Sequence, residues 1–507
     1  MIRPALLVCS LVAALASVVV ARSGAGLAPP RLGIFAQSAD IGPVKHAGSA
    51  VWNADLDQYE VSGAGTNMWK ETDEFHVAWK KVKGDVILDA RVQFLGNGVD
   101  PHRKLGWIVR TSLAADSAYA DIAVHGDGLT SLQFRRKTGG LTEQVASAVK
   151  APDVIRLSRT GSKFTMAVAK FGDALQAAAP VELDLGDEVY VGLFVCSHHP
   201  DTLETGVFSN VRITLPAPAD FRPYRDYLGS RLETLEVETG RRKVVHTETD
   251  SLQAPNLDAD GKSLVYNRNG KLYRFTFTTG RAAEIDTGFA TKNNNDHVLS
   301  RDGRRLGISH HSADHDNKSM IYTLPAGGGV PKLATTRGPS YLHGWSPDGQ
   351  SLLYAGLRDG DIDIYRVPVA GGDEIRLTTA KGVDDGPECT PDGKTIYFNS
   401  ERSGLMQIWK MDADGTHQTQ VTDDAFNNWF PHVSPDGKSF VVISYRKGDV
   451  TPGDHPFYKQ VCLRLFPTAG GPGRVIANLY GGQGTINVPS WSPDGKRLAF
   501  VSNTREP

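Results

Sequence analysis

The chain has 507 residues, too many for one hydrophobic core, and this length predicts two to four domains. Its 53 glycines and 28 prolines, with few long helical patterns, favour an all-β protein rich in turns. The formal net charge is -2 and acidic and basic residues are interspersed, so neither nucleic acid nor an anionic membrane surface is an expected partner.

Residues 1–22 have the features of a signal peptide. Arg3 supplies a positive charge, an apolar run extends from Ala5 to Val20, and small residues that suit a signal peptidase are found near its end. The run is short for a membrane helix, which needs about 20 apolar residues. We therefore expect cleavage, a periplasmic or secreted protein, and no transmembrane span in the mature chain.

The cysteines predict no disulfide framework. Cys9 lies inside the signal peptide, and Cys196, Cys389 and Cys462 have no C-x-x-C spacing. Because Cys196 and Cys462 stand in apolar, strand-like runs, we expect them to be buried as small hydrophobic residues.

Residues 31–215 predict a two-sheet β-sandwich. Short segments that alternate apolar and polar residues, such as 86–94 and 163–169, are separated by polar turns, which is typical of a sandwich or jelly roll. The closing stretches GLFVCS (192–197) and VFSNV (207–211) resemble those of concanavalin-like jelly rolls, in particular domains of unknown function found beside carbohydrate-active modules. The resemblance implies a concave face that binds sugar or another ligand.

Four tryptophans fall in this region, and most should be core residues. Trp69 differs because its neighbours are polar and turn-like. An exposed indole ring stacks well on a sugar ring, so Trp69 is the tryptophan that we expect to contact a ligand. The segment 216–225, rich in proline, follows and predicts a semi-rigid linker at the domain boundary.

Residues 226–507 repeat a Pro-Asp-Gly turn or a degraded copy of it. The aspartates of these turns stand at positions 260, 302, 348, 392, 436 and 494, at intervals of 42 to 58 residues. Proline presets φ for the turn and glycine accepts the positive φ that it needs. Each turn precedes two strands, a Gly-rich turn and an outer strand, a repeat typical of a propeller blade.

The number of turns predicts six blades, one of them composite. After the last turn only one strand remains before Pro507, whereas strand-like runs at 232–238 and 241–246 precede the first turn. We expect these segments to share a blade, because an open ring would leave an unpaired strand edge. The unit that begins at Asp436 also carries an insertion at 446–459.

These repeats resemble the TolB-type propeller with its WD40-like, or PD40, repeats. The resemblance implies the fold more than the function, since such repeats serve translocation proteins, peptidase gating domains and some polysaccharide lyases. The sandwich takes the place of the α/β domain that precedes the propeller in TolB. No Gly-x-Ser-x-Gly elbow occurs in the chain, which excludes a serine peptidase of the propeller-gated type.

Polar residues just before each turn should converge on the central channel. His297, His343, Glu388 and His432 stand four or five positions before the aspartate of consecutive turns. Imidazole and carboxylate groups bind divalent metals and also transfer protons, so these four residues predict a catalytic or metal site at one mouth. The further candidates for ligand binding in the channel are Asp296, Asp385, Asn256 and Ser490.

Propeller oligogalacturonate lyases are similar in drawing histidines from different blades to hold a divalent metal. This resemblance implies a site for a metal such as Mn, Zn or Ca, although no cofactor is certain from the residues. The alternative is a polar, water-filled channel without catalysis. The run Asp314-His315-Asp316-Asn317 lacks the glycine and glutamate of an EF-hand and is expected to be a solvated loop.

Two recognition folds without a complete catalytic motif favour an exported binding protein. Its expected partner is a glycan or an envelope protein, held at the channel mouth and on the sandwich face. The alternatives are a carbohydrate-active lyase or hydrolase with a His/Glu metal site in the channel, and a TolB-like envelope scaffold.

Overall fold

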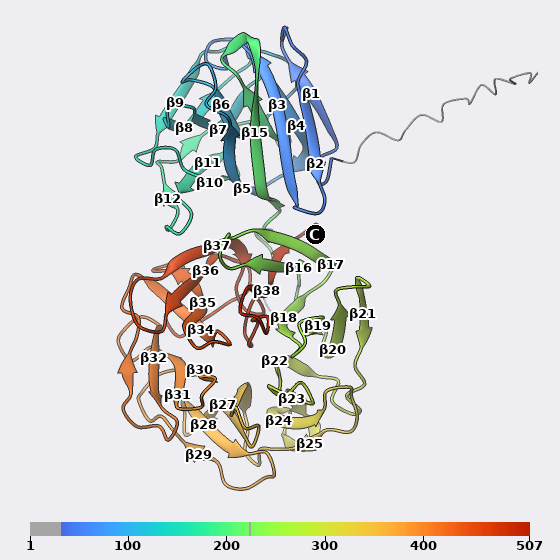
Figure 1. The fold of residues 1–507 in the computed structure, drawn as a ribbon, viewed down its shortest axis with the longest axis vertical. Helices are drawn as coiled ribbons and strands as arrows, with labels where there is room; N and C mark the ends of the chain where they lie inside the picture. Colours follow the sequence, from blue (N-terminus) through green and yellow to red (C-terminus); the bar gives the residue numbers. More distant parts are fainter. Residues whose placement is uncertain (1–31, 223–224) are drawn as a thin grey trace, which may run out of the picture. The chain divides into compact units, whose positions relative to one another are not determined.

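The computed structural model describes residues 32–222 and 225–507. The predicted signal peptide and Cys9 lie outside these residues. The described chain is built of β-strands in eight sheets, with one short 3₁₀ turn, η1 (Ala313–His315). Figure 1 shows these sheets with the strand labels used below. The predicted all-β class is confirmed, and the residues that the structure describes include no helix long and apolar enough to cross a membrane.

The first two sheets are formed by residues 32–215, which we call the two-sheet domain. One sheet has the strand order β1 (Gln37–Ile41), β4 (Phe75–Lys83), β14 (Glu188–Cys196), β6 (Lys104–Arg110), β7 (Tyr119–His125), β8 (Thr130–Arg135) and β9 (Thr142–Ala146). The other has the order β12 (Gln176–Ala177), β11 (Lys163–Ala169), β10 (Val154–Thr160), β5 (Val86–Leu95), β15 (His199–Thr214), β3 (Gln58–Gly65) and β2 (Ser49–Asn53), with β13 (Val181–Glu182) beside β11.

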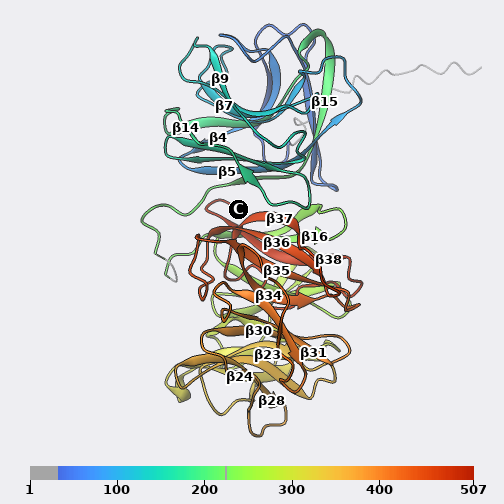
Figure 2. The same cartoon turned by 90° about the vertical axis from the view of Figure 1, so that its left-hand side faces the viewer.

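The two sheets share one hydrophobic core. Trp107 and Val191 from the first sheet and Leu88 and Phe208 from the second belong to the same buried cluster. Side chains alternate between the faces of a strand, so Ile108, next to Trp107, belongs to a separate cluster. Figure 2 shows β4 and β14 in one layer and β5 in the other. Trp107 is therefore a core residue, as predicted.

Five four-stranded sheets form the complete blades of a propeller. They are β18 (Leu252–Leu257) to β21 (Arg281–Glu284), with β19 (Ser263–Arg268) and β20 (Lys271–Thr276); β22 (Asn293–Leu299) to β25 (Lys332–Leu333), with β23 (Arg305–Ser312) and β24 (Lys318–Pro325); β26 (Ser340–Trp345) to β29 (Ile375–Arg376), with β27 (Ser351–Arg358) and β28 (Asp361–Pro368); β30 (Asp384–Cys389) to β33 (Thr419–Gln420), with β31 (Thr395–Ser400) and β32 (Gln407–Asp412); and β34 (Phe426–Val433) to β37 (Arg474–Gly481), with β35 (Ser439–Arg446) and β36 (Lys459–Pro467).

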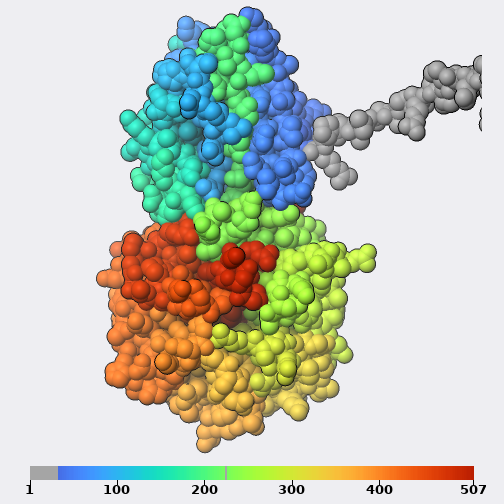
Figure 3. Space-filling view, in the orientation of Figure 1, coloured from blue at the N-terminus to red at the C-terminus, as the bar shows by residue number. Residues whose placement is uncertain are grey.

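The sixth blade is composite, as predicted. Its order is β17 (Arg242–Glu248), β16 (Gly229–Glu236) and β38 (Arg497–Thr504), and Trp491 adds a bridge to Leu498 at the inner side. In Figure 3 the last residues of the chain, in red, lie directly beside the first propeller residues, in green. The pairing of the two ends closes the ring, so no inner blade edge is left open.

The Pro-Asp-Gly turns have the geometry that their sequence predicts. In the turn at 346–349, the Ser346 hydroxyl and the backbone N–H of Gln350 donate to the Asp348 carboxylate at 2.5 and 3.0 Å. Gly349 has a φ of 67°, a conformation that side chains with a Cβ disfavour. The same serine-to-aspartate contact recurs in the turns at 302, 436 and 494, with threonine in its place at 392.

Charged side chains also join the two-sheet domain to the propeller. Arg212 of β15 pairs with Glu233 of β16 at 2.8 Å, and Arg156 of β10 donates to the Gln460 side chain at 2.9 Å.

Cys196 and Cys462 are buried and unbonded to each other, as expected of small hydrophobic residues.

Candidate functional site

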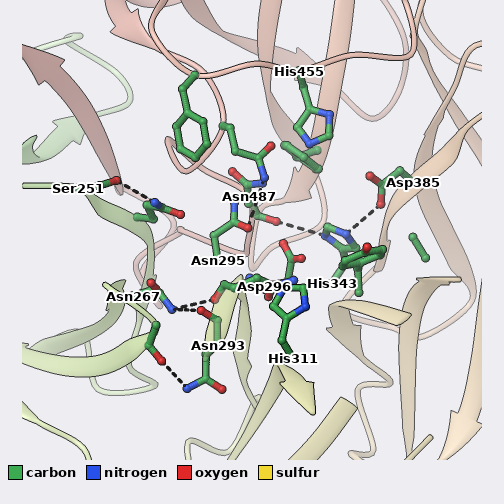
Figure 4. Close-up of a pocket in the computed structure, with 18 of the residues that line it drawn as sticks. Ser251, Asn267, Asn293, Asn295, Asp296, His311, His343, Asp385, His455 and Asn487 are labelled. Atoms are coloured by element: carbon green, nitrogen blue, oxygen red, sulfur yellow. Dashed lines mark hydrogen bonds and ion pairs between the residues drawn. The ribbon is translucent and has the colours of Figure 1, made fainter. Parts of the chain in front are cut away.

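A cavity of about 580 Å³ opens at one end of the propeller channel. We call it the mouth cavity. The residues that line it include Gln253, Asn267, Asn293, Asn295, Asp296, Tyr341, His343, Asp385, Phe430, His455, Gln483 and Asn487. Figure 4 shows that its labelled side chains come from several blades. Its volume suits a small ligand or the end of a chain.

Local irregularities in the inner strands decide which side chains face this cavity. The register shifts between Gln253 and Asn256 in β18, and between Asp385 and Glu388 in β30. Gly386 in the second bulge has a φ of 62°. A bulge of this kind adds one residue and re-aims the side chains that follow it. Gln253 and Asp385, which precede these bulges, line the mouth cavity, whereas Asn256 and Glu388, which follow them, do not.

Phe430 marks the same place in β34 and carries backbone strain. Its φ is 56°, in the left-handed region that a bulky residue rarely adopts. Its backbone N–H donates to the Asn399 side chain at 3.1 Å, and its ring stacks on His343 with 5.6 Å between centroids. A backbone conformation of this kind persists only where the surrounding structure stabilises it, and such strained residues cluster at functional sites.

His343 is the charged centre of the cavity. Its Nε2 lies 2.9 Å from the Asp385 carboxylate and its Nδ1 lies 3.3 Å from the carbonyl oxygen of Asn487. Burial works against protonation, but Asp385 and then Asp296 outweigh it and raise the pKa of His343 to about 9. The imidazole is therefore a cation at neutral pH, with both ring N–H groups directed at oxygen acceptors.

Asp296 lies at the edge of this ion pair. It is only 5% exposed, and burial raises the pKa of its carboxyl to about 7, although His343 opposes the shift. Asp385 has the opposite behaviour, because His343 outweighs burial and lowers the pKa of its carboxyl. Near neutral pH the cavity thus contains one ion pair and one carboxyl that exchanges its proton readily.

Side-chain amides form most of the remaining wall. Asn267 donates to the carbonyl oxygens of Asn293 and Asn294 at 3.0 and 2.8 Å, which holds the strand edge in place. The amide nitrogen of Asn295 and the amide oxygen of Asn293 are buried and have no partner among the described residues. A buried polar group without a hydrogen bond costs free energy. A ligand with both donors and acceptors could satisfy both groups.

His455 enters the cavity from the insertion between β35 and β36. Its ring lies 4.2 Å from the Trp429 ring and 5.2 Å from that of Phe430, measured between centroids. Burial lowers the pKa of His455, so the ring is neutral at neutral pH. The sequence predicted this insertion but did not indicate that it contributes to the site.

The structure does not bring His297, His343, Glu388 and His432 together. His432 pairs with Glu388 at 2.7 Å, away from the mouth cavity, and its other ring nitrogen contacts the carbonyl oxygen of Ile486. His297 is fully buried, 3.3 Å from the carbonyl oxygen of Val265, and burial lowers its pKa to about 4. Of these four side chains, His343 lines the mouth cavity and the other three do not.

Two other predicted residues lie outside the mouth cavity, and one of them, Asn256, joins neighbouring blades. Asn256 donates to the carbonyl oxygen of Pro489 at 2.5 Å and accepts from the N–H of Leu299 at 2.7 Å. The Ser490 hydroxyl is buried and donates to the carbonyl oxygen of Val488 at 2.7 Å. Of the predicted channel residues, Asp296, His343 and Asp385 are those that line the mouth cavity.

Residues 32–222 and 225–507 contain no group of three His, Cys, Asp or Glu side chains placed to hold a metal ion. His343 and Asp385 form an ion pair with Asp296 beside it, and the His455 ring contacts aromatic rings.

In the two-sheet domain, Trp69 is 36% exposed, with the Lys104 ammonium 5.9 Å from the centre of its ring. Its ring thus retains free surface.

Sequence reasoning missed the asparagines at 267, 293, 295 and 487, and Phe430. One signal was present: the run Asn293-Asn294-Asn295 precedes Asp296 in a strand where the other repeats differ. Asparagine is depleted in strands, so three in succession favour a role other than stability.

Fold and site together define a six-bladed PD40 propeller with a polar mouth. Residues 332–455 match the family model described as PD40, TolB beta propeller domain. The uncharacterized protein Atu1656 of Agrobacterium fabrum is 45% identical over 273 residues, which is 54% of this chain and 92% of that protein. The chain therefore belongs to the family of TolB-like propeller proteins that includes Atu1656.

One solved structure agrees with this assignment. A candidate TolB from Agrobacterium tumefaciens is 44% identical, with a TM-score of 0.52, and the match covers 55% of this chain and 99% of that one. An oligogalacturonate lyase in complex with manganese is 13% identical with a TM-score of 0.34, over 56% of this chain and 77% of that one. A likeness that low supports no argument about metal or catalysis.

Proposed function

We propose that this chain is an exported binding protein of the TolB-like family that takes an extended segment of an envelope protein in its mouth cavity. The observation that carries this proposal is the unpartnered amide oxygen of Asn293 and the unpartnered amide nitrogen of Asn295, in a cavity lined by further amides. In an extended peptide, a backbone N–H can donate to the Asn293 oxygen and a backbone C=O can accept from the Asn295 nitrogen. The family relationship supports an envelope protein as partner.

A photo-crosslinking residue tests this proposal. It would replace Tyr341, which lines the mouth cavity, and in a control Leu141, which is 65% exposed in the two-sheet domain. We expect a discrete protein adduct in cells from position 341 alone, and loss of that adduct when Asn295→Leu is added. Equal adducts from both positions would contradict the proposal. Glycan-array binding that Asn295→Leu abolishes, without a protein adduct, would identify a glycan as the ligand instead.

The two-sheet domain is part of the same proposal. We infer that it is a concanavalin-like jelly roll over residues 31–215, joined by a linker at 216–225 to the propeller at 226–507. The exposed ring of Trp69 supports a role in binding sugar. If so, Trp69→Ala weakens retention of the protein on a polysaccharide column, whereas Trp107→Phe, a change in the core, leaves retention unaltered once folding is checked.

One observation favours a second candidate function, a carbohydrate-active lyase or hydrolase. A carboxyl with a pKa of about 7, as in Asp296, is suited to general acid–base catalysis. Incubation with polyuronate and analysis of the products tests this reading. Cleavage that Asp296→Asn abolishes would establish it, and intact polymer at every pH would exclude it for that substrate.

A further inference from the structure

A second cavity, of about 500 Å³, lies between the two-sheet domain and the composite blade. We call it the junction cavity. Its apolar wall is formed by Trp52, Tyr59, Val82, Val211 and Ile213. Four basic residues also line it: Lys80 of β4, Arg212 of β15, and Arg231 and Lys243 of β16 and β17. The cavity therefore combines an apolar body with a cationic rim.

Two of the three carboxylates near this rim, Asp57 and Glu233, are already engaged. Asp57 lies 3.0 Å from Arg212 on one side, and Glu233 lies 2.8 Å from it on the other. Glu233 also pairs with Arg242 at 2.7 Å. Glu506 lines the cavity as well, but its side chain is exposed and forms no ion pair among the described residues.

Arg231 is the buried cation of this cavity that no described carboxylate contacts directly, and Glu233 and Asp57 attract it only at longer range. It is only 9% exposed, and it donates to the carbonyl oxygen of Ile213 at 2.7 Å and to the Thr214 hydroxyl at 3.5 Å. No carboxylate of residues 32–222 or 225–507 forms an ion pair with Arg231. Burial, together with the neighbouring Arg212, lowers the pKa of Arg231 to about 10. A buried guanidinium in this position is costly unless an anion compensates it.

Two ammonium groups, those of Lys80 and Lys243, add to the positive charge that lines the junction cavity. Lys80 is half-buried and has no hydrogen-bond or ion-pair partner among the described residues. Lys243 is exposed and donates to the carbonyl oxygen of Asp55 at 3.3 Å. Guanidinium and ammonium groups together are the donors that bind carboxylate and phosphate groups.

We propose that the junction cavity binds a small organic anion, a carboxylate or a phosphate ester on an apolar or ring-shaped body. The anionic group pairs with Arg231 and Lys80, and the body packs against Trp52 and Val82. This site is separate from the mouth cavity and does not depend on the function proposed for it. Because the cavity is lined by both parts of the chain, an occupant stabilises their contact.

Fluorescence titration with 8-anilinonaphthalene-1-sulfonate, an aromatic anion, tests the proposal on the full chain. We expect saturable binding at one site, weakened about tenfold or more by Arg231→Gln, because a charge-assisted hydrogen bond is lost. Arg222→Gln serves as the control, since Arg222 is exposed and pairs with Asp226 outside the cavity. N-phenyl-1-naphthylamine, which has the rings without the charge, should bind equally to all variants.

Several outcomes would overturn the proposal: dye binding unchanged in Arg231→Gln, or the neutral dye lost in parallel with the anionic one. If Arg231→Gln does not fold, as judged by circular dichroism, Lys80→Gln decides by the same criterion. Benzoate and phenyl phosphate are then used as competitors. The one that displaces the dye at lower concentration identifies the anionic group, and failure of both to displace it would also contradict the proposal.

Discussion

Two of the ionisable side chains at the mouth, Asp296 and His343, bind protons more tightly in the folded chain. His343 has its pKa raised to about 9, so the stability from its charge is fully present below about 6.5 and is lost as pH rises through 9. Asp296 has its pKa raised to about 7, so the folded chain keeps a proton that the unfolded chain has already released. Both effects make stability fall as pH increases.

We therefore expect Asp296→Asn to flatten the pH dependence of stability. Between about pH 4 and 7 this carboxyl alone lowers the free energy of unfolding by about 1.4 kcal/mol per pH unit, and asparagine cannot titrate. Urea unfolding at pH 5 and pH 7 measures the slope. Asp373→Asn, an exposed change without a contact in the structure, should leave the slope as in the wild type. Parallel slopes for all three proteins would show that Asp296 titrates normally.

At the scale of elements, the Pro-Asp-Gly turn has the same structural role in each repeat. It orients the strand that follows and places its proline against the turn of a neighbouring blade. A Cβ at Gly393, for example, would lie 3.4 Å from the Pro347 side chain. Because the pattern is local, the turns and the number of blades could be predicted from sequence alone.

Gly393→Ala should destabilise the propeller by about 1–2 kcal/mol, because φ at this position is 72° and a Cβ is disfavoured there. Gly327→Ala is the matched control, since its φ is not positive and no atom lies within 4 Å of the added Cβ. Thermal unfolding followed by circular dichroism compares the two. A Tm loss of the same size in both variants would contradict the role given to φ.

At the scale of the whole molecule, Glu233 connects four strands. It is fully buried, pairs with Arg212 of β15 and Arg242 of β17, and accepts from the Ser502 hydroxyl of β38. Burial opposes its charge, but the two guanidinium groups outweigh this and hold the pKa of Glu233 well below its usual range. The same residue thus joins the composite blade and the two-sheet domain.

Glu233→Gln should cost about 3 kcal/mol or more, because it leaves the buried guanidinium of Arg242 without a carboxylate and that of Arg212 with Asp57 alone. For the wild type, the stability from Glu233 is present above the ordinary glutamate pKa and is lost as pH falls below it. Calorimetry on both proteins at neutral and acidic pH tests this. Glu236→Gln, which breaks an exposed ion pair with Arg241, should cost less than about 1 kcal/mol.

The amino-acid sequence by itself determined the all-β class, the repeat, the six blades and the composite closure. These features depend on turn chemistry and on strand alternation, which act over a few residues and recur with a fixed period. Asp296, His343 and Asp385 could also be named from sequence as channel residues.

Only the tertiary structure decided which of the channel residues share a cavity. The bulges in the inner strands turn Glu388 and His432 away from the mouth and bring Asn295 and Phe430 into it. A one-residue change of register reverses the face of every side chain that follows, and a bulge has no reliable sequence signal. The junction cavity was unpredictable for a related reason, since Lys80 and Arg231 come from distant strands and line one cavity only in the folded chain.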